Sequence, residues 1–190
     1  MLCFSGDISS QSVRWSQPMI DNNKFQYLKI IGSDGDGFFV LRSNISLNSV
    51  RDRSGFKNRK YLMQYFGNDL NLRWEEELLS PLEGGKITDI QVMGDKAMVL
   101  FYTRDKTTKQ FNFYSQFLNT SGKWLSQPVL LDAFSTEEFD EENKPGILLC
   151  HDQSKFALSY RKFQKDREIQ SFMVVVADQN LSVLYKTEII

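Results

Sequence analysis

The sequence predicts an all-β protein in which one unit of four strands occurs three times. Three apolar runs each follow a tight polar turn: GDGFFVLR at 35–42, GDKAMVLFY at 94–102 and QSKFALSYR at 153–161. Val40, Val99 and Leu158 hold equivalent places in these runs, and 59 residues separate each from the next (99 − 40 and 158 − 99). A fixed period of this kind indicates a repeated structural unit. Long helices are disfavoured, because no segment sustains an apolar period of 3.6 residues over several turns.

The first three strands of each unit are predicted from short apolar stretches bounded by Gly, Asp or Pro. The first strand precedes the polar turn, as YLKIIG (27–32), ITDIQV (87–92) and GILLCH (146–151). The three apolar runs are the second strands. A polar loop then leads to the third strands, YLMQYF (61–66), FNFYSQF (111–117) and SFMVVVA (171–177).

A second turn, GNDLN, LNTSG or ADQN, leads into the fourth strand of each unit. Its Asn, Asp and Gly residues supply the left-handed backbone conformations that tight hairpins require. The fourth strands are LRWEEEL (72–78), KWLSQPVLL (123–131) and SVLYKTEII (182–190). Each unit is therefore an antiparallel meander.

One domain is the default for a chain of 190 residues. The three units would span 25–79, 86–131 and 146–190. A four-stranded sheet cannot bury both of its faces alone, so the units must stack, and radial stacking gives a β-propeller with blades of about 40–50 residues. A β-sandwich is the alternative, but four strands are too few for an independent two-sheet core.

The segment RWSQP at 14–18 nearly repeats KWLSQP at 123–128, where a fourth strand is expected to begin. We therefore expect an orphan outer strand at 12–20. In closed propellers an N-terminal strand commonly completes the last blade and removes a sheet edge, so Trp15 would pack against a blade that these residues do not contain. Three blades are too few to close a ring, which predicts either a larger propeller with further blades in the same chain or a half-ring homodimer.

The pattern of a strand, a polar turn and a strand that opens with Trp, as in NDLNLRW and NTSGKW, resembles the blades of secreted or surface β-propellers of bacteria, including those of the Bacteroidetes outer-membrane machinery. The resemblance covers nearly the whole chain and implies an extracytoplasmic location. No functional motif of these proteins matches, so the resemblance gives no residue a role. The segment 1–6, MLCFSG, fits either the end of a signal peptide or a plain start.

Composition disfavours several classes of partner. The chain has 23 Lys and Arg against 24 Asp and Glu, so it lacks the basic excess of a nucleic-acid binder. No apolar run approaches the ~20 residues that a membrane-spanning helix needs. Cys3 and Cys150 could form one bridge at most, and Cys150 is expected to be a buried free thiol.

No set of residues points to catalysis, a metal or a cofactor. His151 is the single histidine, and as the neighbour of Cys150 on a strand it would point to the opposite face, so the two would not form a catalytic pair. Asp34 and Asp36 in SDGDG (33–37) are spaced like calcium ligands, but the further ligands of a calcium loop are missing. A hairpin turn accounts for them.

Basic residues gather in the loops that join second and third strands, beside an acidic segment, TEEFDEEN at 136–143. In a meander these loops emerge on one edge of every blade. Eleven of the basic residues in these loops are candidate binding residues: Arg51, Arg53, Lys57, Arg59, Lys60, Arg104, Lys106, Arg161, Lys162, Lys165 and Arg167. Such a band could steer a protein partner or an anionic glycan toward this edge, although exposed hairpin tips are also charged simply because they are solvated.

The leading interpretation is a non-enzymatic protein-binding or scaffolding module, as a subunit of an extracytoplasmic bacterial assembly. The alternative is a carbohydrate-active or other hydrolytic propeller whose active site is completed by residues outside these 190. Glycoside hydrolysis requires two convergent carboxyl groups, and convergence cannot be read from the sequence. Fold alone does not decide between these functions.

Overall fold

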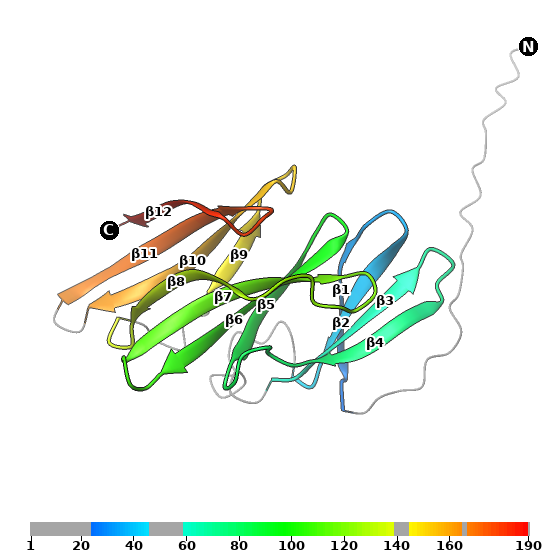
Figure 1. Ribbon diagram of the computed structural model, residues 1–190, viewed down its shortest axis with the longest axis horizontal. Helices are drawn as coiled ribbons and strands as arrows, with labels where there is room; N and C mark the ends of the chain where they lie inside the picture. The colour runs from blue at the N-terminus through cyan, green and yellow to red at the C-terminus, as the bar shows by residue number, and fades with distance from the viewer. Residues whose placement is uncertain (1–23, 46–58, 139–144, 165–166, 190) are drawn as a thin grey trace, which may run out of the picture.

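Twelve strands and no helix make up the described part of the chain in the computed structural model (Figure 1). The structure describes residues 24–45, 59–138, 145–164 and 167–189. Sheet A holds the first four strands, β1 (Tyr27–Ser33), β2 (Gly37–Ser43), β3 (Tyr61–Gly67) and β4 (Leu72–Leu78). Sheet B holds β5 (Lys86–Met93), β6 (Lys96–Asp105), β7 (Gln110–Asn119) and β8 (Val129–Ser135). Sheet C holds β9 (Gly146–Leu149), β10 (Lys155–Gln164), β11 (Arg167–Asp178) and β12 (Val183–Ile189).

Each sheet is an antiparallel meander in which strands adjacent in sequence are hydrogen-bonded neighbours. The turns between strands carry the polar residues that predict them. In the SDGDG turn, the Asp34 carboxylate accepts the amide hydrogens of Asp36 and Gly37, with N···O distances of 3.1 and 2.9 Å, and the hydroxyl of Tyr65 at 3.0 Å. The prediction of an all-β fold built from three four-stranded units is confirmed.

Several elements differ from the sequence-based expectation. Strands β6, β10 and β11 are longer than expected, so Arg104 lies on β6, Arg161 and Lys162 on β10 and Arg167 on β11, whereas all four were expected in loops.

Strand β8 begins at Val129, whereas the fourth strand of this unit was expected at 123–131. Trp124 forms an isolated bridge with Leu118, the Gln116 side chain donates a hydrogen bond to the Ser126 carbonyl, and Pro128 has no N–H to donate to a ladder. These features keep 124–128 out of the regular ladder.

Strand β9 ends at Leu149, so Cys150 and His151 lie in the following turn and not on a strand as expected. The Cys150 thiol donates a hydrogen bond to Asp152, with an S···O distance of 2.8 Å, while the His151 side chain is exposed. The thiol is half-buried and free, and not fully buried as expected.

The sheets pack face to face in chain order. We call the face of a sheet that points toward the next sheet in the sequence its forward face, and the opposite one its backward face. Between sheets A and B, Phe39 and Met63 on the forward face of A share a core with Val92 and Val99 on the backward face of B. Between sheets B and C, a second core joins the forward face of B to the backward face of C.

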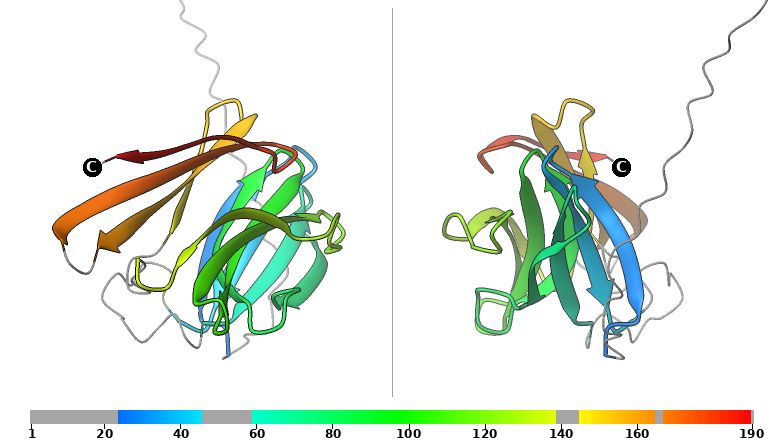
Figure 2. Two further views of the ribbon diagram at one scale, coloured as in Figure 1. Left: turned by 60° about the vertical axis from the view of Figure 1, so that its left-hand side comes forward. Right: turned by 90° about the vertical axis from the view of Figure 1, so that its right-hand side faces the viewer.

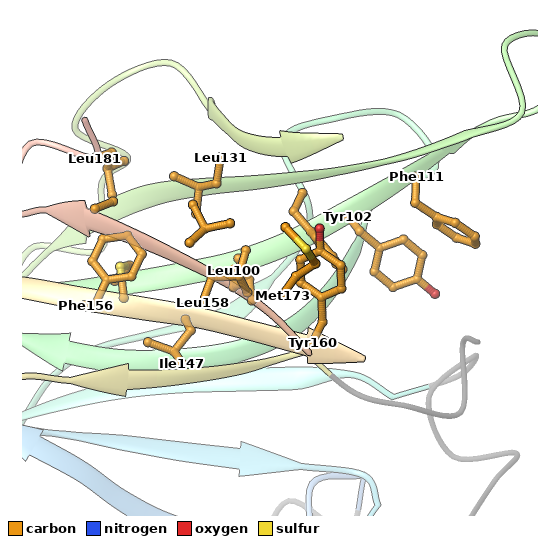
Figure 3. Packing of buried hydrophobic residues seen from close by; sticks show 14 of the residues in the cluster. Leu100, Tyr102, Phe111, Leu131, Ile147, Phe156, Leu158, Tyr160, Met173 and Leu181 are labelled. Atoms are coloured by element: carbon orange, nitrogen blue, oxygen red, sulfur yellow. The ribbon is translucent and has the colours of Figure 1, made fainter. Parts of the chain in front are cut away.

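Figure 3 shows the second core, where Leu100 and Leu131 of sheet B lie toward Leu158 and Met173 of sheet C. All four side chains are at least 95% buried. Because burial of a large aliphatic side chain stabilises a protein by about 1.5–3 kcal/mol, these two cores hold the three sheets together.

The three residues that define the repeat hold the same position in their sheets. Val40, Val99 and Leu158 each lie in the middle of the second strand of their sheet and point backward, because their neighbours on the strand point forward. Their exposed fractions are 3%, 0% and 0%. The 59-residue period therefore corresponds to an equivalent strand position, and two of the three residues, Val99 and Leu158, lie in a core between two sheets.

The first strand of each sheet is the innermost one. Strand β1 lies against β5, and β5 lies against β9. The approach of β1 to β5 is so close that a Cβ atom on Gly32 would lie 2.5 Å from the Cβ of Val92. Meanders arranged with their first strands together and their fourth strands outermost are adjacent blades of a β-propeller (Figure 2).

Polar contacts across the outer strands add to the apolar packing. The indole of Trp74 on β4 donates a hydrogen bond to the carbonyl of Thr120 in the β7–β8 turn. Gly122 in this turn has a φ of 76° and lies under the same indole ring. A tryptophan at the start of a fourth strand thus ties one blade to the next. The orphan strand predicted at 12–20 lies outside the described residues.

Candidate binding face

The described residues among those predicted to bind a partner lie along one edge of the sheets. Strands β2, β4, β6, β8 and β10 end at this edge and the strands that follow them begin there. We call it the long-loop edge. Of the predicted residues, Arg51, Arg53, Lys57 and Lys165 lie outside the described residues. Those that lie at or beside the edge are Arg59, Lys60, Arg104, Lys106, Arg161, Lys162 and Arg167.

A hollow of about 200 Å³ opens at this edge where sheets A and B meet. Its lining comes from the start of β3, the end of β4 with the following turn, and the start of β5: residues 59–61, 77–80 and 85–87. The turn is tight because Gly85 donates its amide hydrogen to the Leu82 carbonyl, with N···O 3.0 Å. A Cβ on Gly85 would lie 2.1 Å from the Ser80 hydroxyl oxygen, so this turn requires glycine at that position.

The lining carries an excess of positive charge. Arg59, Lys60 and Lys86 face one carboxylate, Glu77, which leaves a formal surplus of two positive charges (3 − 1). Glu77 is shared between two lysines: its Oε2 lies 2.6 Å from the Nζ of Lys24, and its Oε1 lies 3.9 Å from the Nζ of Lys60. The hollow is therefore suited to an anionic group and already contains one internal anion.

Tyr61 forms part of the hollow's wall. Burial raises the pKa of its hydroxyl, and the hydrogen bond and charge of Arg59 offset this in part. The hydroxyl therefore stays protonated at neutral pH and is not an activated nucleophile. It contributes a neutral polar group to a basic lining.

Lys86 was not among the predicted binding residues. It is the first residue of β5 and follows directly on the Gly84-Gly85 turn, and its ammonium lies 5.8 Å from the centre of the Tyr102 ring. The prediction considered loops between second and third strands, whereas Lys86 follows the connection from one blade to the next. Basic residues in both kinds of connection would have to be considered to find it.

The other predicted residues lie away from the hollow. The guanidinium of Arg104 lies 5.6 Å from the Phe111 ring centre, and that of Arg161 lies 5.2 Å from the Phe172 ring centre. The side chain of Lys162 is 16% exposed, and its ammonium lies 3.6 Å from Glu138 and 3.8 Å from Glu188. Among the described candidates, the structure thus brings together only Arg59 and Lys60, with Lys86 added.

A second polar cluster lies in the seam between sheets B and C. The hydroxyl of Tyr160 donates a 2.6 Å hydrogen bond to the buried carboxylate of Asp132, which also accepts one from Lys186. Burial raises the pKa of Tyr160 strongly, and the hydrogen bond to Asp132 raises it further. A nucleophilic tyrosine would need a lowered pKa, so this cluster connects two blades and does not resemble a catalytic centre.

Metal ligands and membrane spans can be assessed for the described residues alone. In these ranges, no group of three or more His, Cys, Asp or Glu side chains could hold a metal ion. The same ranges contain no helix of the length and apolarity required to cross a membrane.

The comparisons with known proteins give a similarity of structure and no match of sequence. No protein-family model and no curated sequence matches the chain. Among solved structures, the chain is similar to the crystal structure of an endo-arabinase from Bacteroides thetaiotaomicron VPI-5482, with a TM-score of 0.46 and 13% sequence identity. The match covers 90% of this chain and 66% of the endo-arabinase, so the chain spans less than two thirds of the length of that protein.

Proposed function

We propose that this chain is a binding module of a β-propeller and takes an anionic ligand on its long-loop edge. The observation that carries the proposal is the hollow between sheets A and B, whose lining has three cations and one carboxylate. Preformed concave sites with a few converging polar groups are where proteins bind small ligand groups. A hollow of about 200 Å³ suits one acidic residue of a longer polymer.

The charge pattern also predicts how binding responds to salt. Lys60 is exposed, so its attraction for an incoming anion acts through solvent and is screened by ions over about 8–10 Å at physiological ionic strength. Such charges chiefly accelerate association. We therefore expect a ligand whose affinity falls as salt rises.

A carboxylate is the shared chemistry of two possible ligands, an acidic stretch of a partner protein and a glycan that contains uronic acid. Both occur outside the cytoplasm, where the resemblance to bacterial surface propellers would place this module. Isothermal titration with poly-glutamate and with polygalacturonate distinguishes the two. The proposal requires that at least one of them binds to the protein.

The variant that tests the site carries Lys60→Glu and Lys86→Glu, which turns the formal surplus of two positive charges into a deficit of two. We expect it to lose binding at least tenfold. Lys123→Glu is the matched control, because Lys123 is exposed in the β7–β8 turn at the opposite edge of sheet B. Equal affinity in the double variant and the wild type would refute the proposal.

A second candidate function is cleavage of a carbohydrate, the kind of activity for which the similar endo-arabinase is named. Hydrolysis of a glycosidic bond requires a pair of carboxyl groups. Asp89 places one carboxylate on the innermost strand β5, where it accepts the amide hydrogen of Ile147 with an N···O distance of 3.3 Å. In this candidate the second carboxyl group comes from outside the described residues. Release of reducing ends from arabinan or polygalacturonate would favour it, whereas binding without release would favour the binding module.

A further inference from the structure

The forward face of sheet C exposes large apolar side chains. Leu148 on β9, Phe172 on β11 and Tyr185 on β12 are 67%, 43% and 58% exposed, and Ile189 is 56% exposed. They share one face because Phe172 pairs with Ile189, and because Val176 pairs with Tyr185. Sheet C lies at one end of the row of three sheets (Figure 1), and among the described residues no sheet covers this face.

The equivalent forward faces of sheets A and B are buried. On the forward face of sheet A, Phe39 and Met63 are fully buried under sheet B. On the forward face of sheet B, Met98 and Leu100 are fully buried under sheet C. An exposed apolar surface on one sheet that is equivalent to buried interfaces on the other two marks an interaction site.

The two existing interfaces define what the occupant of this face must look like. In both, a forward face receives a backward face whose second strand carries an aliphatic residue at its centre, Val99 in sheet B and Leu158 in sheet C. At the long-loop edge of sheet C, Arg161 stacks on Phe172 and supplies a positive charge. A matching partner is an antiparallel four-stranded sheet with an aliphatic centre and a carboxylate near Arg161.

A second copy of this chain does not fit that description through sheet A. The backward face of sheet A would have to receive the forward face of sheet C, but its central residues are not available for contact. Val40, Leu62 and Phe66 on that face are 3%, 5% and 4% exposed within a single chain. The same type of blade must therefore come from a different polypeptide segment.

We propose that the forward face of sheet C is a docking surface for a further four-stranded blade of the same 59-residue repeat. The blade continues the stacking of A on B and of B on C. This inference is independent of ligand binding at the long-loop edge, since the hollow lies between sheets A and B.

The first experiment measures the surface in the 190-residue chain. The fluorescence of 8-anilinonaphthalene-1-sulfonate reports exposed apolar surface, and we expect the wild type to bind this dye. The variant Phe172→Glu with Tyr185→Glu should reduce the fluorescence severalfold and leave the melting temperature within about 2 °C, because both side chains are exposed. Absence of dye binding by the wild type, or equal binding by the variant, would overturn the proposal.

The second experiment supplies the blade. A copy of residues 136–145 as linker and then a copy of 86–135 follow Ile190, because the backward face of sheet B is apolar throughout its core. We expect the extended chain to melt a few degrees higher. Dye fluorescence is not the readout for this chain, because the added copy of sheet B leaves its own apolar forward face, with Met98 and Leu100, uncovered. Val174→Glu, at the centre of the forward face, should abolish this gain in melting temperature in the extended chain and change the 190-residue chain little.

Two outcomes would contradict the proposal. One is an extended chain that melts at the same temperature as the 190-residue chain. The other is sedimentation of the 190-residue chain as a dimer that Val174→Glu dissociates, which would make a second copy the occupant of this face.

Discussion

The hydrogen bond between Tyr160 and Asp132 offers a sharp test of how two blades are joined. Tyr160→Phe removes one oxygen atom and nothing else from the seam between sheets B and C. The ring of residue 160 keeps its packing against Phe113 and Phe134, with ring centres 5.4 and 4.6 Å apart. The substitution therefore isolates the hydroxyl from the hydrophobic core around it.

The magnitude of the effect follows from the surroundings of the acceptor. A hydrogen bond to a charged group contributes about 1.5–3 kcal/mol to stability. Asp132 retains the bond from Lys186 and also accepts the amide hydrogen of Ala133 at 2.8 Å, so its carboxylate is not left without partners. We therefore expect a loss of about 2 kcal/mol in the free energy of unfolding, which lowers the melting temperature by about 4–8 °C in a domain of this size.

Urea unfolding followed by circular dichroism measures this loss. Tyr185→Phe is the matched control, since the side chain of Tyr185 is exposed on β12 and its hydroxyl should contribute almost nothing. If Tyr160→Phe unfolds within 0.5 kcal/mol (roughly the scatter of surface substitutions) of the wild type, the seam is not held by this bond.

Three other predictions concern the packing, the titration and the charge of single residues. Gly32→Ala should lower the free energy of unfolding in urea by about 1–3 kcal/mol, because the new Cβ would lie 2.5 Å from the Cβ of Val92. The control is Gly146→Ala on the innermost strand of sheet C. There the new Cβ meets nothing closer than 3.8 Å, so the loss should be much smaller. Burial and a hydrogen bond to the Asp34 carboxylate raise the pKa of Tyr65 to about 12. The contribution of the protonated hydroxyl to stability is therefore complete below pH ~10 and is lost as the pH rises through ~12. An ultraviolet titration in which every tyrosine ionises near pH ~10 would contradict this. Glu77→Gln removes the internal anion of the hollow and should raise the affinity for a polyanion roughly two- to fivefold. A lower affinity in the isothermal titration would show instead that Glu77 is needed for binding.

Most of the fold could be predicted from the sequence because each strand is short, apolar and followed by a turn with Asn, Asp or Gly. The fourth strand of sheet A was predicted at the residues where it forms, 72–78. The predicted start of β8 was wrong, because the aromatic and apolar residues of KWLSQP are typical of a strand. The side-chain bond from Gln116 to Ser126 depends on tertiary structure and leaves no local signal.

The hollow could be predicted only in part. Its three segments are far enough apart in the chain that nothing in the sequence shows that Lys86 lies beside Arg59 and Lys60. Likewise, the sequence predicts that Lys162 is one more exposed cation, but the packing of sheet C on sheet B places its ammonium near Glu138 and Glu188. Loop composition predicts which edge is basic, whereas only the fold decides which of its charges converge.

The most direct test of the proposed function is to locate the ligand on the protein. Amide chemical shifts in ¹⁵N-labelled protein, followed during titration with oligogalacturonate or oligo-glutamate, report the residues that a bound anion touches. Our account predicts that the shifts concentrate at 59–61, 77–80 and 85–87 and weaken as salt is added. Shifts that gather instead on the turns of the opposite edge, or no shifts with either ligand, would contradict it.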